Sequence, residues 1–86
     1  MRVLIPSQLR SYTHGAAEIE ARGATLDELL INIDREFKGF RFRIVDEQDR
    51  VRRHIKVFVN RSEVRELSHP LAPLDEVQII GALSGG

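Results

Sequence analysis

The sequence predicts an α+β domain in which one main helix packs across a mixed sheet of four to five strands. With 86 residues, the chain suits a single small domain with one core. Only one stretch repeats apolar residues at helical spacing, whereas several short stretches alternate or are rich in branched apolar residues. A helix and a sheet that are each apolar on one side bury those sides by packing against each other in two layers.

The first two strands are expected to form a hairpin. Residues 2–6 are rich in branched side chains and place Val3 and Ile5 on one face and Leu4 on the other. A turn-prone stretch follows. Residues 16–21 then alternate apolar and acidic side chains, which is typical of a second short strand with an exposed acidic face.

The helix is predicted to begin after Thr25. Thr25 and Glu28 match a capping box, in which the threonine hydroxyl accepts a hydrogen bond from the glutamate amide and the glutamate reaches back. The apolar residues that follow recur at three- and four-residue spacing and form one stripe: Leu26, Leu29, Leu30, Ile33 and Phe37. Gly39 is expected to end the helix.

Residues 40–44 alternate aromatic or aliphatic side chains with arginine, which predicts a short extended segment. Phe40 and Phe42 are expected to turn inward beneath the end of the helix. The polar residues 46–50 that follow are interpreted as an exposed loop.

Two further strands are expected in the second half of the chain. Residues 54–60 bury every second side chain, which places Phe58 on the opposite, exposed face. After a turn at 60–63, a brief returning segment at 64–67 and a proline-containing loop, residues 76–80 form the last strand with Ile80 facing outward.

Phe58 and Ile80 are therefore expected to form an apolar patch on the open face of the sheet, extended by Leu4. Such a patch favours a protein partner. The alternative is that these three side chains have no binding role, because scattered apolar side chains are common on protein surfaces.

Composition excludes several classes of function. Thirteen basic and thirteen acidic residues leave no net charge, so the overall field attracts neither nucleic acid nor an acidic membrane. The chain has no cysteine, which excludes disulfides, thiolate nucleophiles and zinc–thiolate sites, and its three histidines lack metal-ligand spacing. No segment is typical of a signal peptide or a membrane span, and the cytoplasm is the expected location.

The basic residues are unevenly distributed. Ten of the thirteen lie between Arg35 and Arg65, together with five acidic residues. This basic stripe could bind RNA or an acidic protein surface. Because Arg50, Arg52 and Arg53 stand beside several acidic residues, the favoured interpretation is a solvated loop, and no nucleic-acid partner is expected.

Four short motifs stand in order along the second half of the chain: Val59-Asn60, His69-Pro70-Leu71, Asp75-Glu76-Val77 and the terminal Leu83-Ser84-Gly85-Gly86. In this order they resemble the motifs of the MoaD/ThiS family of ubiquitin-like sulfur carriers, whose carboxyl terminus is similar to the last four residues here. The chain departs from the family pattern at Pro73-Leu74, where many relatives have a glycine. The resemblance covers nearly the whole chain and implies that residues 1–86 form one β-grasp domain, with 81–86 as a flexible tail.

The resemblance also implies a chemistry. In the family, an ATP-dependent activating enzyme adenylates the terminal carboxylate, here that of Gly86, and a sulfur donor converts it to a thiocarboxylate. Leu83, Ser84 and Gly85 would belong to the tail that reaches the enzyme. The chain would be a substrate and carrier rather than a catalyst, and ATP would be used by the activating enzyme, with no cofactor bound to this chain.

The same resemblance implies the partners. The activating enzyme would grip the open sheet face at Phe58, Ile80 and Leu4. The acceptor of the sulfur would be a pyridoxal-phosphate enzyme similar to cysteine synthase, or the large subunit of molybdopterin synthase. Two alternatives stay open: a ubiquitin-like modifier joined to lysines through the same tail, and a binding module that uses the basic stripe.

Overall fold

The computed structural model describes residues 1–81. Within them the chain forms five strands, two α-helices and one 3₁₀ helix, η1. In chain order these are β1 (Arg2–Leu4), η1 (Ser7–Thr13), β2 (Glu18–Glu20), α1 (Leu26–Glu36), α2 (Phe40–Ile44), β3 (Ile55–Val59), β4 (Ser62–Val64) and β5 (Glu76–Gly81).

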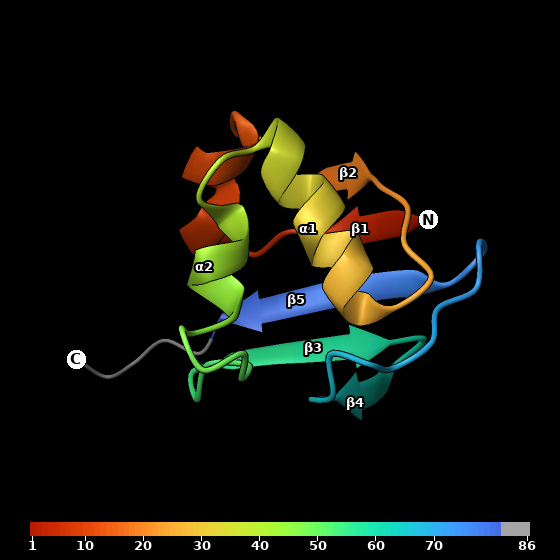
Figure 1. Cartoon of the computed structure of the whole chain (residues 1–86). Coiled ribbons are helices and arrows are strands. Elements are labelled where there is room, and N and C mark those ends of the chain that lie inside the picture. The colour runs from red at the N-terminus through yellow and green to blue at the C-terminus, as the bar shows by residue number, and fades with distance from the viewer. Residues whose placement is uncertain (82–86) are drawn as a thin grey trace.

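The five strands form one mixed sheet in the order β2-β1-β5-β3-β4. The first and last strands are parallel neighbours, with Arg2 opposite Glu76, and all other pairs are antiparallel. Figure 1 shows both α-helices on the same side of β3 and β5. The predicted α+β arrangement is confirmed, and the last strand lies in the middle of the sheet.

Helix α1 follows its sequence signals closely. The Thr25 hydroxyl accepts a hydrogen bond from the amide of Glu28 at 3.2 Å, and the Glu28 carboxylate accepts one from the amide of Ala24 at 2.9 Å. The predicted stripe faces the core, with Phe37 only partly buried. The helix ends at Glu36, before the expected stop at Gly39.

The prediction of an extended segment at residues 40–44 is wrong, because these residues form helix α2. Its entry is held by Asp34, whose Oδ1 accepts hydrogen bonds from the amides of Gly39 and Arg41 at 3.1 and 3.0 Å. Phe40 and Ile44 are fully buried, four residues apart on one helical face. Phe42 is 52% exposed, so the expectation that it turns inward is also wrong.

A second helical segment was not expected. Residues Ser7–Thr13 form η1, which buries Leu9 and Thr13 and packs against α2. The buried hydroxyl of Thr13 donates a hydrogen bond to the carbonyl of Ala16 at 2.9 Å, so burial leaves this polar group satisfied.

Strands β3 and β4 form a tight hairpin. Asn60 and Arg61 have φ values of 49° and 75°, and Val59 pairs with Ser62. A two-residue turn with two positive φ angles matches the twist of the flanking strands. The returning strand therefore begins directly after the turn, at Ser62, rather than at the predicted residue 64.

The core lies between the sheet and the helices. The predicted inward faces of β3 and β5 are confirmed. Among residues 1–81, the buried apolar residues are Val3, Ile5, Leu9, Leu26, Leu29, Leu30, Ile33, Phe40, Ile44, Val45, Val51, Ile55, Val57, Val59, Val64, Val77 and Ile79.

Candidate functional site

The candidate site lies at the end of β5. The strand ends at Gly81, which pairs with Ile55 of β3, so the structure places Gly81 in the sheet and not in the tail. The predicted tail residues Leu83, Ser84, Gly85 and Gly86 lie outside the described residues. The described part of the site is therefore the root of the tail, Gly81, and the surfaces around it.

One side chain holds this root. Gln8, in the first turn of η1, donates a hydrogen bond from Nε2 to the carbonyl oxygen of Gly81 at 2.9 Å. No motif in the sequence marks Gln8, because the contact joins residues that are 73 positions apart.

The three residues of the predicted apolar patch lie on the open sheet face. Leu4 of β1 and Phe58 of β3 both pair with Gln78 of β5, from opposite sides, and Ile80 follows two residues later on β5. Ile80 is 38% exposed, and Leu4 and Phe58 are half-buried. The patch is thus interrupted by one glutamine, and its role in partner binding stays a prediction.

Charged residues border the patch on the same face. Glu18 pairs with Leu4, Glu63 with Phe58, and Lys56 with Ile80. A partner that covers the apolar residues must therefore accommodate carboxylates at two sides and an ammonium group at a third.

A shallow hollow connects the patch with the root of the tail. It has a volume of about 470 Å³ and includes Leu4, Pro6, Gln8, Ile80 and Gly81 in its lining. Leu4 and Ile80, two of the three patch residues, therefore share one hollow with the hydrogen-bonded tail root, whereas Phe58 lies outside its lining.

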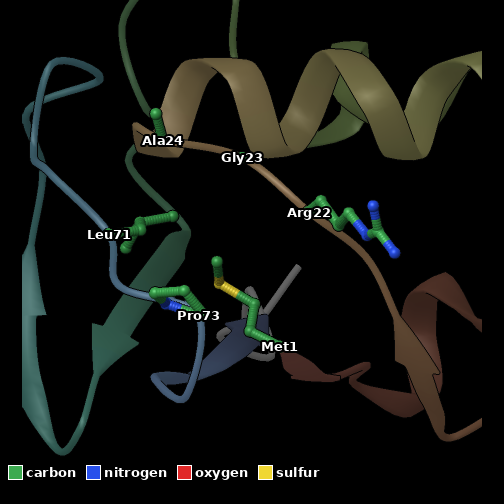
Figure 2. A pocket seen from close by; sticks show the side chains of 6 residues that line it. All are labelled: Met1, Arg22, Gly23, Ala24, Leu71 and Pro73. Atoms are coloured by element: carbon green, nitrogen blue, oxygen red, sulfur yellow. The ribbon is translucent and has the colours of Figure 1, made fainter.

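A larger hollow, of about 650 Å³, lies elsewhere (Figure 2). It is lined by Met1, Arg22, Gly23, Ala24, Leu71 and Pro73, and Figure 2 shows the Arg22 side chain extending away from Met1 and Leu71. Met1 precedes β1 and Pro73 precedes β5. Since these strands are parallel, this hollow lies at the end of the sheet opposite Gly81.

The predicted basic stripe is divided by the fold. Arg41 pairs with Asp27 at 2.7 Å and Arg65 with Glu63 at 3.6 Å. Arg52 lies at the tail-root end, because its carbonyl accepts a hydrogen bond from the amide of Ile55, the residue opposite Gly81.

Arg52 is itself held by an exposed aromatic ring. Its guanidinium carbon lies 4.5 Å from the centre of the Phe42 ring, and its Nε donates to the Phe42 carbonyl at 2.8 Å. Arg43 lies 5.8 Å from the ring centre of Tyr12 in the same way. Each of these two cations is therefore positioned by an aromatic ring, Arg43 on α2 and Arg52 in the segment before β3.

Across residues 1–81, no group of three or more histidine, cysteine, aspartate or glutamate side chains is arranged to hold a metal ion. None of the helices in this part of the chain is long and apolar enough to cross a membrane.

Residues 3–86 match the sequence profile of the ThiS family. The chain belongs to the ThiS family. The match runs through Gly86, so the matched residues include the terminal pair of glycines as well as the strands of the sheet.

Individual relatives in the ThiS family cover almost the whole chain. The sulfur carrier protein CysO of Mycobacterium bovis is 30% identical over 89 residues, which is 98% of this chain and 96% of that protein. The CysO protein of Mycobacterium tuberculosis matches with the same identity and coverage.

Solved structures show the same fold. A chain in the crystal structure of the Amycolatopsis orientalis BexX/CysO complex superposes with a TM-score of 0.91 at 33% identity, covering 99% of this chain and 98% of that one. The crystal structure of Mycobacterium tuberculosis CysO superposes with a TM-score of 0.89 at 29% identity, covering 95% of this chain and 98% of that one. The fold is the ubiquitin-like β-grasp that the resemblance implied.

The small archaeal modifier protein 1 of Methanosarcina acetivorans also superposes, with a TM-score of 0.82 at 21% identity, covering 99% of this chain and 94% of that one. At this identity the likeness shows a shared fold alone.

Proposed function

We propose that this chain is a sulfur carrier whose terminal Gly86 carboxylate is converted to a thiocarboxylate that donates sulfur in a biosynthetic pathway. The observation that carries the proposal is the ThiS-family match, which extends through the terminal glycines. The 30% identical relatives that span the chain bear the name sulfur carrier protein.

The chemistry explains why partners are needed. A free carboxylate is a poor acyl donor, because its leaving group would be oxide. An activating enzyme therefore joins a Gly86 carboxylate oxygen to the α-phosphorus of ATP and releases pyrophosphate. A sulfide nucleophile then forms the C–S bond as the bond to AMP breaks, and loss of a proton leaves the thiocarboxylate.

This chain supplies the acyl group and the docking surface. It has no cysteine to act as a sulfur nucleophile, so the sulfur comes from a partner. The nucleotide site would belong to the activating enzyme, and this chain would act as a carrier and not as an enzyme. Leu83, Ser84 and Gly85 would link the reacting carboxylate to the folded domain. Glycine in this tail suits a narrow channel, since a Cβ atom is absent.

The partners follow from the same reasoning. The activating enzyme would cover Leu4, Phe58 and Ile80 on the open face, beside the tail root. The acceptor would be an enzyme similar to cysteine synthase, with the large subunit of molybdopterin synthase as the second candidate. The cytoplasm would be the site of action.

The test is reconstitution with the full chain. The chain is incubated with ATP, magnesium, sulfide and the purified activating enzyme of its own organism, and intact-mass spectrometry follows the product. The expected result is a mass gain equal to the replacement of one oxygen by sulfur, located at Gly86 by fragmentation. A chain that lacks Gly86 is the control and should not change.

Two results would contradict the proposal. One is an unchanged intact mass of the folded chain in the presence of an activating enzyme that is shown to be capable of forming an acyl adenylate. The other is accumulation of stable conjugates to lysines of other proteins with no thiocarboxylate, which would assign the chain to the modifier class.

A further inference from the structure

The pairing between β1 and β5 ends before β5 does. The last paired residues are Leu4 and Gln78, yet β5 continues to Gly81. The amide of Ile5 faces β2 and donates to Ala17, in continuation of the β1–β2 register, and Pro6 has no amide hydrogen to donate. Neither of the two residues that follow β1 therefore donates a backbone hydrogen bond to the last residues of β5.

Gln8 supplies the missing donor. Its side-chain Nε2 donates to the Gly81 carbonyl at 2.9 Å, and Gln8 stands two residues after Pro6. The side chain is exposed, so packing alone does not place it there. A backbone carbonyl at the end of a central strand is thus held by a side-chain amide in place of a neighbouring strand.

The absence of a side chain at residue 81 fits this contact. Gly81 is not among the residues with positive φ, so its backbone conformation does not require glycine. A Cβ atom added to Gly81 would lie 3.3 Å from Cδ of Gln8, which is closer than most real Cβ contacts. Glycine here makes room for the Gln8 amide.

We propose that Gln8 is a positioning residue for the carrier tail. By holding the Gly81 carbonyl, it fixes the direction in which the chain leaves β5 and thereby the point from which the tail enters the activating enzyme. Orienting the root before binding reduces the conformational entropy that is lost when the complex forms. This inference rests on the proposed function for its enzymatic consequence, but not for the contact itself.

The contact is tested first without any partner. In the full-length chain, nuclear magnetic resonance should detect scalar coupling across the hydrogen bond from Gln8 Nε2 to the Gly81 carbonyl carbon. Gln8→Glu replaces the donor by a carboxylate, which only accepts. The coupling should disappear and the order parameter of the Gly81 amide should fall. Ser11→Ala, an exposed change on the same 3₁₀ helix, should alter neither value.

The consequence is tested with the activating enzyme. Gln8→Glu should raise the KM for the carrier by about threefold to tenfold, the factor that corresponds to one lost hydrogen bond. The kcat should be unchanged, because the enzyme itself holds the tail once it is bound. Ser11→Ala should keep both parameters at the wild-type values.

Gly81→Ala and Gln8→Ala together form a double-mutant cycle. The coupling between the two changes in this cycle would not arise from a general loss of stability. The added methyl displaces Gln8 and should raise KM by a similar factor in the wild-type background. In a Gln8→Ala background the same change should add little, because the contact is already absent. Fully additive effects would overturn the proposal.

The remaining outcomes separate this inference from the proposed function. If the wild-type chain is never adenylated, the sulfur-carrier function fails, while the coupling experiment still tests the contact. If the wild-type chain is adenylated and Gln8→Glu keeps the wild-type KM, Gln8 does not position the tail. A lower kcat with unchanged KM would also overturn the positioning role.

Discussion

Asn60 and Asp75, fifteen residues apart, are joined by a hydrogen bond of 2.8 Å from Asn60 Nδ2 to Asp75 Oδ1. Asn60 Oδ1 also accepts from the amide of Glu76 at 3.0 Å, and Asp75 Oδ2 accepts from the amide of Ala72 at 2.8 Å. The β3–β4 turn is thereby attached to the chain that enters β5. Two motifs that carry the family resemblance are thus one structural junction, at the opposite end of β5 from Gly81.

This junction predicts a dependence of stability on acid. Hydrogen bonds from the Ala72 amide and the Asn60 side chain lower the pKa of Asp75. Because the folded-state pKa lies below the unfolded value, the stabilisation is present above the ordinary carboxyl range and is lost as pH falls through the folded pKa.

Asp75→Asn should therefore lower the thermal midpoint at neutral pH and flatten its decline toward acid. The measurement is thermal unfolding by circular dichroism from neutral to strongly acidic buffer. Glu36→Gln, at an exposed carboxylate on α1, is the control. An acid profile for Asp75→Asn that runs parallel to the wild type would contradict the assignment.

The entry to α2 depends on one carboxylate. Asp34→Ala removes the acceptor for the amides of Gly39 and Arg41 and should lower the free energy of unfolding by about 1 kcal/mol, as for other helix caps. Urea denaturation measures the change. Glu36→Ala, two residues away and exposed, should change stability less, and equal effects would show that the cap contributes little.

The open face should bind the activating enzyme. Phe58→Asp or Ile80→Asp should weaken that affinity by about 1 to 3 kcal/mol while the fold persists, as expected for loss of an apolar anchor. Ile31→Asp is the matched control, because Ile31 is 37% exposed, close to the 38% of Ile80, but lies on α1.

Calorimetric titration measures each affinity, and circular dichroism verifies the fold. Val57→Asp should unfold the chain, since Val57 is fully buried. Equal affinities for the Ile80 and Ile31 variants would remove the open face from the interface.

Removal of Gly86 should abolish thiocarboxylate formation and leave the thermal midpoint unchanged. Within residues 1–81 the buried core runs from Val3 to Ile79 and is complete enough to form without the last glycine. Differential scanning calorimetry and intact-mass spectrometry on the same sample separate the two effects. A large fall in the midpoint would show that Gly86 contributes to the folded domain.

Single-stranded RNA should form no saturable complex in the micromolar range at physiological salt, a range that is typical even of non-specific binders. Arg52 is engaged with Phe42, and Arg50 donates to the Gln48 side chain at 2.8 Å. Fluorescence anisotropy with labelled RNA measures the binding. Tight, salt-sensitive binding that is lost on replacement of Arg50, Arg52 and Arg53 would favour the binding-module alternative.

Regular periodicity made much of the fold predictable. The β3 and β5 faces follow from strict alternation, and α1 follows from its cap and its apolar stripe. Residues 40–44 were misassigned because Phe40, Phe42 and Ile44 satisfy alternation, while Phe40 and Ile44 also satisfy helical spacing. The local sequence fits both a strand and a helix. Packing against α1 and η1 selects the helix, because it buries Phe40 and Ile44 on one face.

The site was predictable only in part. The exposure of Ile80 follows from its place in an alternating strand, and the terminal glycines are visible as a motif. Gln8 could not be found in this way, because its contact with Gly81 requires β1 and β5 to be parallel neighbours. Pro6, which has no amide to donate, and Gln8, whose side chain donates to Gly81, can be related to β5 only once the pairing of β1 with β5 is known.

The central position of β5 also governs how the domain assembles. Its pairing with β1 places Arg2 opposite Glu76, so the middle of the sheet joins residues that are almost the full length of the chain apart. Contacts of such long range slow folding, and they cannot form on the ribosome before β5 has left the exit tunnel. Proteolysis within β5 would remove a neighbour from both β1 and β3. A chain that is cut within β5 would therefore lose the open sheet face together with the tail, whereas a chain that lacks only Gly86 would keep the face and lose only the reacting carboxylate.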